Sequence, residues 1–273
     1  MLIKVNDIEM YCEFHGRGMP LILIPGYAVS SETWSPFWKQ LINHYQVMLI
    51  DNRGTGRSSC PNIQYSIKMM ADDVSNLMDE IGIEKAHILG GSMGGMIAQE
   101  LVLNYPKKVK SLILGMTSCG GPHSIPISGE VQKKMQTAAN PPSGMSEQDV
   151  MELTWSMFYS LSYVEKNREI LKKEVLSVKY PTPLIGKWRQ AQAVQNWEGS
   201  YDKLSEIQVP TLVMGGDNDV IFPPENFKIL ADRIPGAKLH VFKDAPHAFT
   251  REKEDEVVTI LLNFLEEASR YIK

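Results

Sequence analysis

The stretch Ala86-His87-Ile88-Leu89-Gly90-Gly91-Ser92-Met93-Gly94-Gly95 decides the fold that we predict for this chain. Its first six residues read as a strand buried on both faces of a sheet. A helical pattern follows directly and stops before Pro106. The pentapeptide 90–94 matches G-x-S-x-G, a turn so sharp at the serine that only small neighbours avoid a clash. Alone, the pentapeptide also fits an ordinary glycine-rich turn, but the flanking strand and helix favour a turn that lifts the Ser92 hydroxyl above the sheet.

Strands and helices alternate on both sides of this stretch, which predicts a doubly wound, mostly parallel α/β sheet. Two N-terminal strands are joined by a turn at Asn6-Asp7, and a glycine, Gly82, ends the second helix. The pattern predicts eight strands, at 2–5, 8–14, 21–24, 46–50, 86–91, 109–116, 210–214 and 238–242. It predicts helices at about 33–43, 66–81, 93–105, 224–233 and 253–271.

One long segment interrupts this alternation. From residue 119 to 206 the sequence has helical patterns and breakers such as Gly120-Gly121-Pro122, but no convincing strand. The segment lies between two parallel strands, at the sheet edge where ligands bind in such folds. We therefore predict a helical cap at 119–206, inserted into a core formed by 1–118 and 207–273.

Composition excludes several classes of protein. The chain has 273 residues, and 28 basic against 32 acidic residues give a formal charge of −4, which argues against nucleic-acid binding. No apolar run approaches the ~18 residues that a membrane-spanning helix needs. Three widely spaced cysteines (Cys12, Cys60 and Cys119) exclude a disulfide framework and a CxxC site, which favours the cytoplasm. We expect no metal and no cofactor, and the oligomeric state is not predicted.

A serine nucleophile needs a base, and six histidines are candidates. His15 and His44 lie early in the chain, His87 and His240 lie inside strands, and His123 lies in the loop that enters the cap. His247, in Ala245-Pro246-His247-Ala248-Phe249, lies just past the last strand, at the same sheet edge as Ser92. Chain order and sheet edge both favour His247 as the base.

The base in turn needs a carboxylate that fixes its tautomer. Two aspartates follow the strand that ends at Met214, in Gly216-Asp217-Asn218-Asp219. Asp217 is close enough to the strand to bond its own turn, so Asp219 is the better candidate. The other position common for the acid follows the preceding strand. It reads Met116-Thr117-Ser118 and has no acidic residue.

The oxyanion formed during acyl transfer needs two backbone N–H donors. Met93, directly after the serine, supplies one. The loop Pro25-Gly26-Tyr27-Ala28 supplies the other from Tyr27, because Gly26 allows a close approach of the backbone.

Taken together, these residues resemble the α/β-hydrolase superfamily. The resemblance covers the chain outside the cap and rests on Gly90-Gly91-Ser92-Met93-Gly94-Gly95, Asp51-Asn52-Arg53-Gly54-Thr55-Gly56-Arg57-Ser58, Gly216-Asp217-Asn218-Asp219 and Pro246-His247. It implies the order Ser92, Asp219, His247 for nucleophile, acid and base, with donors at Tyr27 and Met93. Pro25-Gly26 departs from the His-Gly of many relatives. The turn at Arg53 is expected to support the site and not to bind phosphate, because no GxGxxG or Gly-Lys-Ser/Thr is present.

The expected function is hydrolysis of a small, largely apolar carboxylic ester through an acyl-enzyme. Cap aromatics are mostly expected in the cap's own core, with Trp155, Phe158 and Trp188 as candidates for the substrate pocket. Enol-lactone and carbon–carbon bond hydrolases share the same three residues, and a small-ligand receptor is a non-catalytic alternative. An epoxide hydrolase or haloalkane dehalogenase would need aspartate in place of Ser92.

Overall fold

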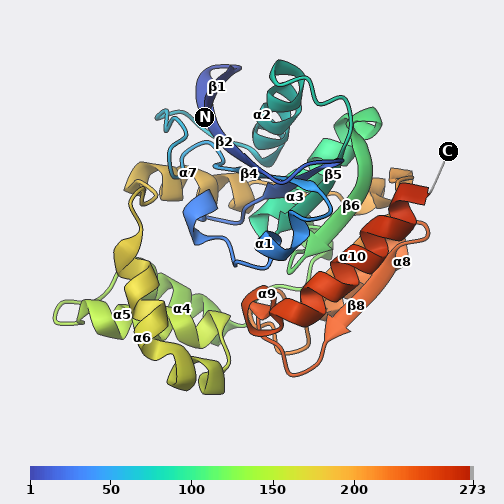
Figure 1. Cartoon of the computed structure of the whole chain (residues 1–273). Coiled ribbons are helices and arrows are strands. Elements are labelled where there is room, and N and C mark those ends of the chain that lie inside the picture. Colours follow the sequence, from blue (N-terminus) through green and yellow to red (C-terminus); the bar gives the residue numbers. More distant parts are fainter. Residues whose placement is uncertain (271–273) are drawn as a thin grey trace.

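A computed structural model describes residues 1–270 and contains one eight-stranded sheet over that range (Figure 1). The strands run in the order β1-β2-β4-β3-β5-β6-β7-β8. Their bounds are β1 Leu2–Val5, β2 Ile8–His15, β3 Pro20–Ile24, β4 Gln46–Ile50, β5 Ala86–Gly91, β6 Val109–Gly115, β7 Thr211–Gly216 and β8 Lys238–Phe242. The predicted eight-stranded sheet is confirmed.

The sheet is parallel from β4 to β8, while β1 pairs with β2 and β2 with β4 in the antiparallel sense. Strand β5 lies between β3 and β6, with Gly90 opposite Ile24 and Gly91 opposite Gly115. The turns after β3, β5 and β6 therefore meet at one edge of the sheet, where parallel α/β folds bind ligands.

Helices cover both faces of the sheet, as the doubly wound pattern predicts. In β3, Ile22 and Ile24 belong to the core on the face of α2, α3 and α8, whereas Leu21 and Leu23 belong to the core on the face of α1 and α10. Alternate residues of a strand point to opposite faces, so a strand apolar at every position needs both layers. The helices of the core are α1 Trp38–Leu41, α2 Ile67–Glu80, α3 Met93–Asn104, α8 Glu225–Arg233, α9 Phe249–Glu252 and α10 Glu254–Arg270.

The prediction of one helix at about 33–43 is wrong in its length. The structure has a short 3₁₀ turn at Ser31–Thr33 and only four residues in α1. Pro36 lies between them; it has no N–H to donate and restricts the residue before it to extended backbone. The last predicted helix corresponds to α10, which begins at Glu254, one residue after the predicted start; the short helix α9 precedes it and was not predicted. The final predicted residue, 271, lies outside the described residues.

The segment expected to be the cap has two parts (Figure 1). Helices α4 (Gly129–Ala139), α5 (Glu147–Phe158) and α6 (Leu161–Ser177) lie together beside the core. One apolar cluster lies within α5 and α6, and a second joins α4 and α5 to Ile221 in the loop after β7. Helix α7 (Leu184–Gln195) packs on the core: Ala193 belongs to the main apolar cluster. A Cβ on Gly186 would lie 2.0 Å from the Gly54 carbonyl oxygen, so the two backbones are in direct contact. The domain limits at 119 and 206 stay a prediction.

The inserted segment leaves and rejoins the core at one narrow neck. The Ser200 N–H donates a hydrogen bond to the Cys119 carbonyl oxygen over 2.8 Å. Gly120 and Gly199 both have positive φ, of 65° and 93°, and a Cβ on Gly199 would lie 2.7 Å from the Gly120 carbonyl carbon. Only glycine combines this backbone conformation with so close a contact.

A buried histidine in β5 makes the stability of the fold depend on pH. His87 is fully buried, its Nδ1 lies 2.7 Å from Ser111 Oγ, and burial lowers its pKa to about 4. Between that value and the ~6.5 of an unfolded chain, the unfolded state binds more protons. The free energy of unfolding is therefore expected to fall by roughly 3 kcal/mol from about pH 7 to pH 4 on account of this residue. Denaturant titrations across that range on the wild type and His87→Gln measure it; parallel curves would contradict the assignment.

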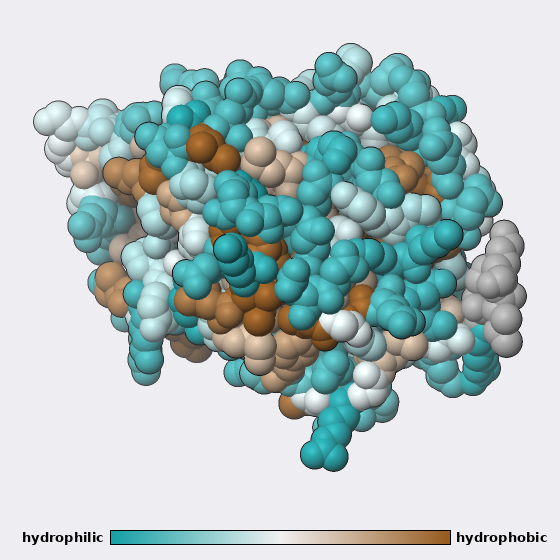
Figure 2. Space-filling view, turned by 90° about the horizontal axis from the view of Figure 1, so that it is seen from above, coloured by the Kyte–Doolittle hydropathy of each residue, from teal (hydrophilic) through white to brown (hydrophobic). Residues whose placement is uncertain are grey.

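Viewed from the side of β1 and α2, the surface is mainly hydrophilic, with apolar residues gathered in separate patches (Figure 2). Among residues 1–270, no helix is both long and apolar enough to cross a bilayer.

Candidate active site

Ser92 lies in a strained turn between β5 and α3. Its φ of 55° and ψ of −122° are unusual for a residue with a side chain. A Cβ on Gly90 would lie 2.2 Å from the Gly94 carbonyl oxygen, and a Cβ on Gly94 would lie 2.0 Å from the Ile24 carbonyl oxygen. The steric reason for the two outer glycines of G-x-S-x-G is thus confirmed.

The backbone of Ser92 is held by β6 and the residues after it. The Ser92 N–H donates to the Gly115 carbonyl oxygen over 2.9 Å, and Thr117 Oγ1 donates to the Ser92 carbonyl oxygen over 2.7 Å. A Cβ on Gly95 would lie 2.5 Å from the Thr117 methyl carbon. Thr117, at the position where an acid was sought and not found, therefore supports the turn that presents Ser92.

His247 and Asp219 form a buried pair. His247 Nδ1 lies 2.8 Å from Asp219 Oδ2, and the two residues are only 6% and 3% exposed. Asp219 Oδ1 accepts two backbone hydrogen bonds, from Ile221 at 2.8 Å and Phe222 at 2.9 Å. These bonds fix the carboxylate and leave Oδ2 for the imidazole. The pair can hold Nδ1–H toward the carboxylate and leave Nε2 as an acceptor.

The three residues Ser92, Asp219 and His247 follow the carboxyl ends of β5, β7 and β8, which are parallel strands of one sheet. Asp217 has a different environment: its Oδ1 accepts the Ala245 N–H over 3.1 Å and thereby joins the loops after β7 and β8. The Asp217 side chain thus bonds the neighbouring loop and not its own turn as expected, and Asp219 is the residue that contacts the imidazole.

The other histidines lie in different surroundings. His123 is exposed and its ring stacks on Tyr201 at 3.9 Å, and His87 is buried in β5. The His15 ring contacts Trp38 at a tilt of 41°, and His240 contacts Phe242 in the edge strand β8. Among the described residues, only His247 is paired with a carboxylate that is itself buried.

The loop of residues 25–28, here called the oxyanion loop, lies directly against Ser92. A Cβ on Gly26 would lie 3.1 Å from Ser92 Cβ and 3.6 Å from Ser92 Oγ. Within residues 1–270 the N–H groups of Tyr27 and Met93 have no hydrogen-bond acceptor, whereas the Ala28 and Val29 N–H groups both have one. The Tyr27 and Met93 N–H groups are thus free to bind an oxyanion, and their oxyanion role stays a prediction.

The three candidate pocket residues lie in different places. Phe158, at the end of α5, contacts the His247 ring edge-on with centroids 5.2 Å apart, and its carbonyl oxygen accepts the Ala248 N–H over 2.9 Å. Trp155 is buried in the cluster between α5 and α6. Trp188 is 51% exposed, two residues from the buried Gln190 on α7, and packs against the guanidinium of Arg189. Of the three, only Phe158 is brought to the buried pair, and the pocket assignments of all three stay predictions.

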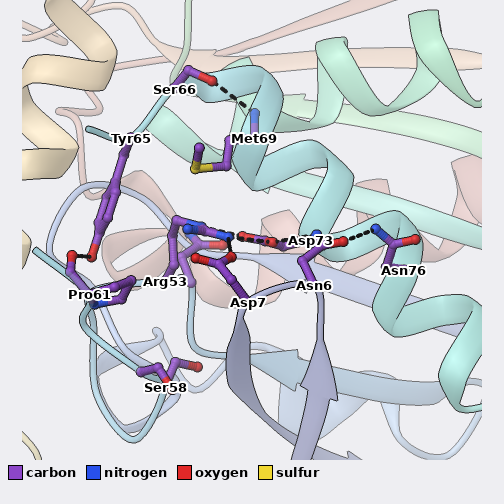
Figure 3. Close-up of polar contacts among 12 residues, drawn as sticks. Asn6, Asp7, Arg53, Ser58, Pro61, Tyr65, Ser66, Met69, Asp73 and Asn76 are labelled. Carbon is purple, nitrogen blue, oxygen red and sulfur yellow. Dashed lines mark hydrogen bonds and ion pairs between the residues drawn. The ribbon is translucent and has the colours of Figure 1, made fainter. Parts of the chain in front are cut away.

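The turn at Arg53 has a structural role (Figure 3). Arg53 is 1% exposed and binds Asp73 through two hydrogen bonds, of 2.5 and 2.8 Å. Its Nη2 also donates to Asp7 over 2.9 Å, and this bond lowers the pKa of the Asp7 carboxyl. The arginine thus joins the turn after β4 to α2 and to the β1–β2 turn.

Removal of one partner of this pair is expected to destabilise the fold strongly, because the other charge stays buried. Asp73→Asn should lower the free energy of unfolding by about 3 kcal/mol or more, measured by denaturant titration. Asp7→Asn is the matched control: Asp7 is about half exposed, so its loss should cost less than about 1 kcal/mol. Equal effects of the two changes would contradict this account.

Three residues with contacts to the site region were not predicted from the sequence: two lie in the inserted segment and one in α9. Gln190 and Thr182 bond the backbone of Ala28, and Glu252 accepts hydrogen bonds from the Ser160 N–H and hydroxyl, each over 2.7 Å. Glu252 begins the run Glu252-Lys253-Glu254-Asp255-Glu256, whose charges alone give no sign of this contact. A lone polar residue on the buried face of α7, between Gly186 and Ala193, was the one available signal for Gln190.

Metal ligands are not gathered anywhere in the described part of the chain: no group of three or more His, Cys, Asp and Glu residues is placed to hold an ion.

Comparison with known proteins assigns the chain to a protein family. The sequence model of the alpha/beta hydrolase fold matches residues 19–253. The chain belongs to the alpha/beta hydrolase fold family. Within that family it is 28% identical over 265 residues to the RutD protein of Azorhizobium caulinodans, provisionally named a carbamate hydrolase, with 95% of this chain and 96% of the relative covered.

Two further similarities show the breadth of this alpha/beta hydrolase family. The 2-hydroxy-6-oxo-6-phenylhexa-2,4-dienoate hydrolase of Comamonas testosteroni is 26% identical, covering 96% of this chain and 92% of the relative. The crystal structure of the enol-lactonase from Burkholderia xenovorans LB400 superposes with a TM-score of 0.83 at 24% identity, covering 97% and 100%. The chain is accordingly a hydrolase, and these names do not assign its substrate.

Proposed function

We propose that this protein hydrolyses small, largely apolar carboxylic esters through an acyl-enzyme formed on Ser92. The observation that carries the proposal is the buried hydrogen bond of 2.8 Å between His247 Nδ1 and Asp219 Oδ2, at the sheet edge where the strained turn presents Ser92. Two backbone N–H groups fix Asp219 Oδ1, so that Oδ2 faces the imidazole. This arrangement is the one that orients a histidine as a general base.

In the proposed reaction, Ser92 Oγ attacks the ester carbonyl carbon while His247 Nε2 takes the hydroxyl proton. The Tyr27 and Met93 N–H groups bind the oxyanion, and the imidazolium then protonates the leaving alcohol as the carbon–oxygen bond breaks. Water attacks the acyl-enzyme, gives its proton to His247, and the acid product leaves with Ser92 restored. Asp219 stays ionised and stabilises the imidazolium in both steps.

The surroundings of His247 support an apolar substrate. Phe158 from α5 and Phe222 from the loop after β7 lie against its ring, with centroids 5.2 and 5.8 Å away. Aromatic walls with few polar groups favour uncharged acyl or alcohol groups. Because α5 reaches the imidazole itself, the bound acyl group is expected to be short to medium in length.

Labelling and turnover together test the proposal. An active-site-directed fluorophosphonate should label the wild type at Ser92, and acetyl, butyryl and octanoyl p-nitrophenyl esters should be hydrolysed, with the shorter esters preferred over triglycerides. Ser92→Ala is the control for both. A labelled protein without turnover would indicate a small-ligand receptor, and an unlabelled protein without turnover would overturn the proposal.

A second candidate shares the same three residues: hydrolysis of an enol-lactone or of a carbon–carbon bond. It is favoured by the likeness to the dienoate hydrolase and to the enol-lactonase fold. The substrate panel should therefore include a lactone, a dienoate ketone and, because of the RutD relative, an aryl carbamate. A higher kcat/KM for one of these than for every ester would replace the ester by that class.

Replacement of Phe158 is expected to change acyl preference and not the chemistry. Phe158→Ala removes an aromatic wall beside His247, so the ratio of kcat/KM for octanoyl over acetyl esters should change by about 1–3 kcal/mol in free energy. Fluorophosphonate labelling of Ser92 should persist. Leu161→Ala, at an exposed position at the start of α6, is the matched control; an unchanged ester profile in Phe158→Ala would contradict the placement of the acyl group beside α5.

A cytoplasmic location remains part of this proposal, on the ground of the odd number and wide spacing of the cysteines.

A further inference from the structure

We propose that Gln190 and Thr182, which lie in the inserted segment, are positioning residues that hold the oxyanion loop against Ser92. The inference rests on the proposed function, because it concerns the loop that carries the Tyr27 N–H. It implies that the rate of acyl transfer depends on the inserted segment and not only on the core.

The backbone of Ala28 is the point that both side chains hold. Its N–H donates to Gln190 Oε1 and its carbonyl oxygen accepts from Thr182 Oγ1, each over 2.9 Å. Ala28 has a φ of 57°, a left-handed conformation that a residue with a Cβ adopts only when its surroundings impose it. The two hydrogen bonds from the inserted segment impose it here.

Gln190 is anchored at both ends of its amide. The side chain is fully buried, and its Nε2 donates to the Arg53 carbonyl oxygen over 2.9 Å. Arg53 is in turn fixed by its buried ion pair with Asp73. Gln190 therefore joins the oxyanion loop to a rigid turn of the core, and loss of its amide would leave the buried Arg53 carbonyl oxygen and the half-buried Ala28 N–H without partners.

These contacts determine the direction of the Tyr27 N–H. That N–H belongs to the peptide plane between Gly26 and Tyr27, whose own carbonyl oxygen accepts the Val29 N–H over 3.3 Å within the loop. The plane before it is held by Asn52 Nδ2, which donates to the Pro25 carbonyl oxygen over 3.0 Å, and the plane after it is held by Gln190. A donor is effective only when it points at the developing oxyanion, so its neighbours on both sides must be fixed.

The inserted segment touches this region at one more point. The N–H groups of Lys179 and Tyr180 donate to the Glu32 carboxylate, over 3.2 and 2.9 Å. Residues 179–190 thus lie along the chain that follows the oxyanion loop. Any displacement of this part would release Ala28 before it disturbed the buried pair of Asp219 and His247.

The test compares four variants of the full chain. Thr182→Val removes the hydroxyl with little change in shape, and Thr182→Ser restores it. Gln190→Leu removes both amide bonds, and Gln195→Leu, at an exposed position on the same helix, is the matched control. Active sites are counted by fluorophosphonate titration, so that kcat refers to labelled enzyme only, and hydrogen exchange of the peptide that spans residues 25–28 is followed in parallel.

We expect kcat to fall about 10-fold in Thr182→Val and about 10- to 100-fold in Gln190→Leu, because a donor that is slightly misplaced loses much of its effect. KM and the pH profile should stay close to those of the wild type, since the bonds matter in the transition state and His247 is untouched. Thr182→Ser should recover kcat, Gln195→Leu should resemble the wild type, and exchange at residues 25–28 should rise in the two damaging variants alone.

The inference would be overturned if Thr182→Val had the wild-type kcat per labelled site and the wild-type rate of hydrogen exchange at residues 25–28. This test holds even if Gln190→Leu fails to fold. An equal fall of kcat in Thr182→Ser and Thr182→Val would overturn it too, because the hydroxyl would then not matter. If the wild type is neither labelled by the fluorophosphonate nor active, the proposed function fails. Faster hydrogen exchange at residues 25–28 in Thr182→Val would even then show that Thr182 holds the oxyanion loop.

Discussion

Ser92→Ala and His247→Ala are each expected to lower kcat by about 10⁴-fold or more for the best ester of the panel. In the proposed reaction the hydroxyl forms the covalent bond and the imidazole moves its proton, so neither has a substitute. The two residues act as one unit, and the double variant should therefore be no slower than either single variant. Steady-state kinetics on protein with wild-type thermal unfolding measure this.

His123→Ala is the matched control for His247→Ala. His123 is exposed and stacks on Tyr201, so its loss should leave kcat within about twofold of the wild type. Residual turnover near the wild-type level in Ser92→Ala, after exclusion of contaminating esterases, would mean that the ester is not cleaved at this serine.

Asp219→Asn is expected to lower kcat by about 10⁴-fold while the fold is kept. The Ile221 and Phe222 N–H groups both donate to Oδ1, which keeps the remaining oxygen of the asparagine at that position. Its NH₂ would then face His247 Nδ1 and donate to it. The imidazole would carry its proton on Nε2 and could no longer accept the serine proton.

Asp217→Asn separates the two aspartates. Its Oδ1 accepts the Ala245 N–H, and an amide oxygen can accept the same bond, so we expect a loss of less than about tenfold. A larger loss in Asp217→Asn than in Asp219→Asn would show that the carboxylate assignment is reversed.

The sheet was predictable because its signals are local. Strands such as Leu21–Ile24 are apolar at every position, and the glycines around Ser92 are explained by contacts within a few residues or with the adjacent strand. The pairing of Asp219 with His247 followed from chain order, since parallel strands bring their carboxyl ends to one edge. The exception is the helix expected at about 33–43, where Pro36 outweighed the periodic pattern.

Contacts of the inserted segment were not predictable from the sequence. Gln190 and Ala28 are 162 residues apart, and Glu252 and Ser160 are 92 apart. A polar side chain on a helix can face water or a distant backbone group, and helical periodicity cannot distinguish the two cases. The same holds for Trp155 and Trp188. The sequence shows that they are aromatic, but not that Trp155 packs between α5 and α6 while Trp188 is half exposed.

The neck at Cys119 and Ser200 makes the inserted segment exchangeable. Since one backbone hydrogen bond joins the two chain ends there, a segment of any length can begin and end at this point without altering the spacing of β6 and β7. Lengthening a closed loop costs only about 0.6 kcal/mol per doubling, so the length of the inserted segment does not limit such an exchange. A replacement segment must instead supply groups that hold Ala28 and an apolar face for the core surface that Ala193 now covers.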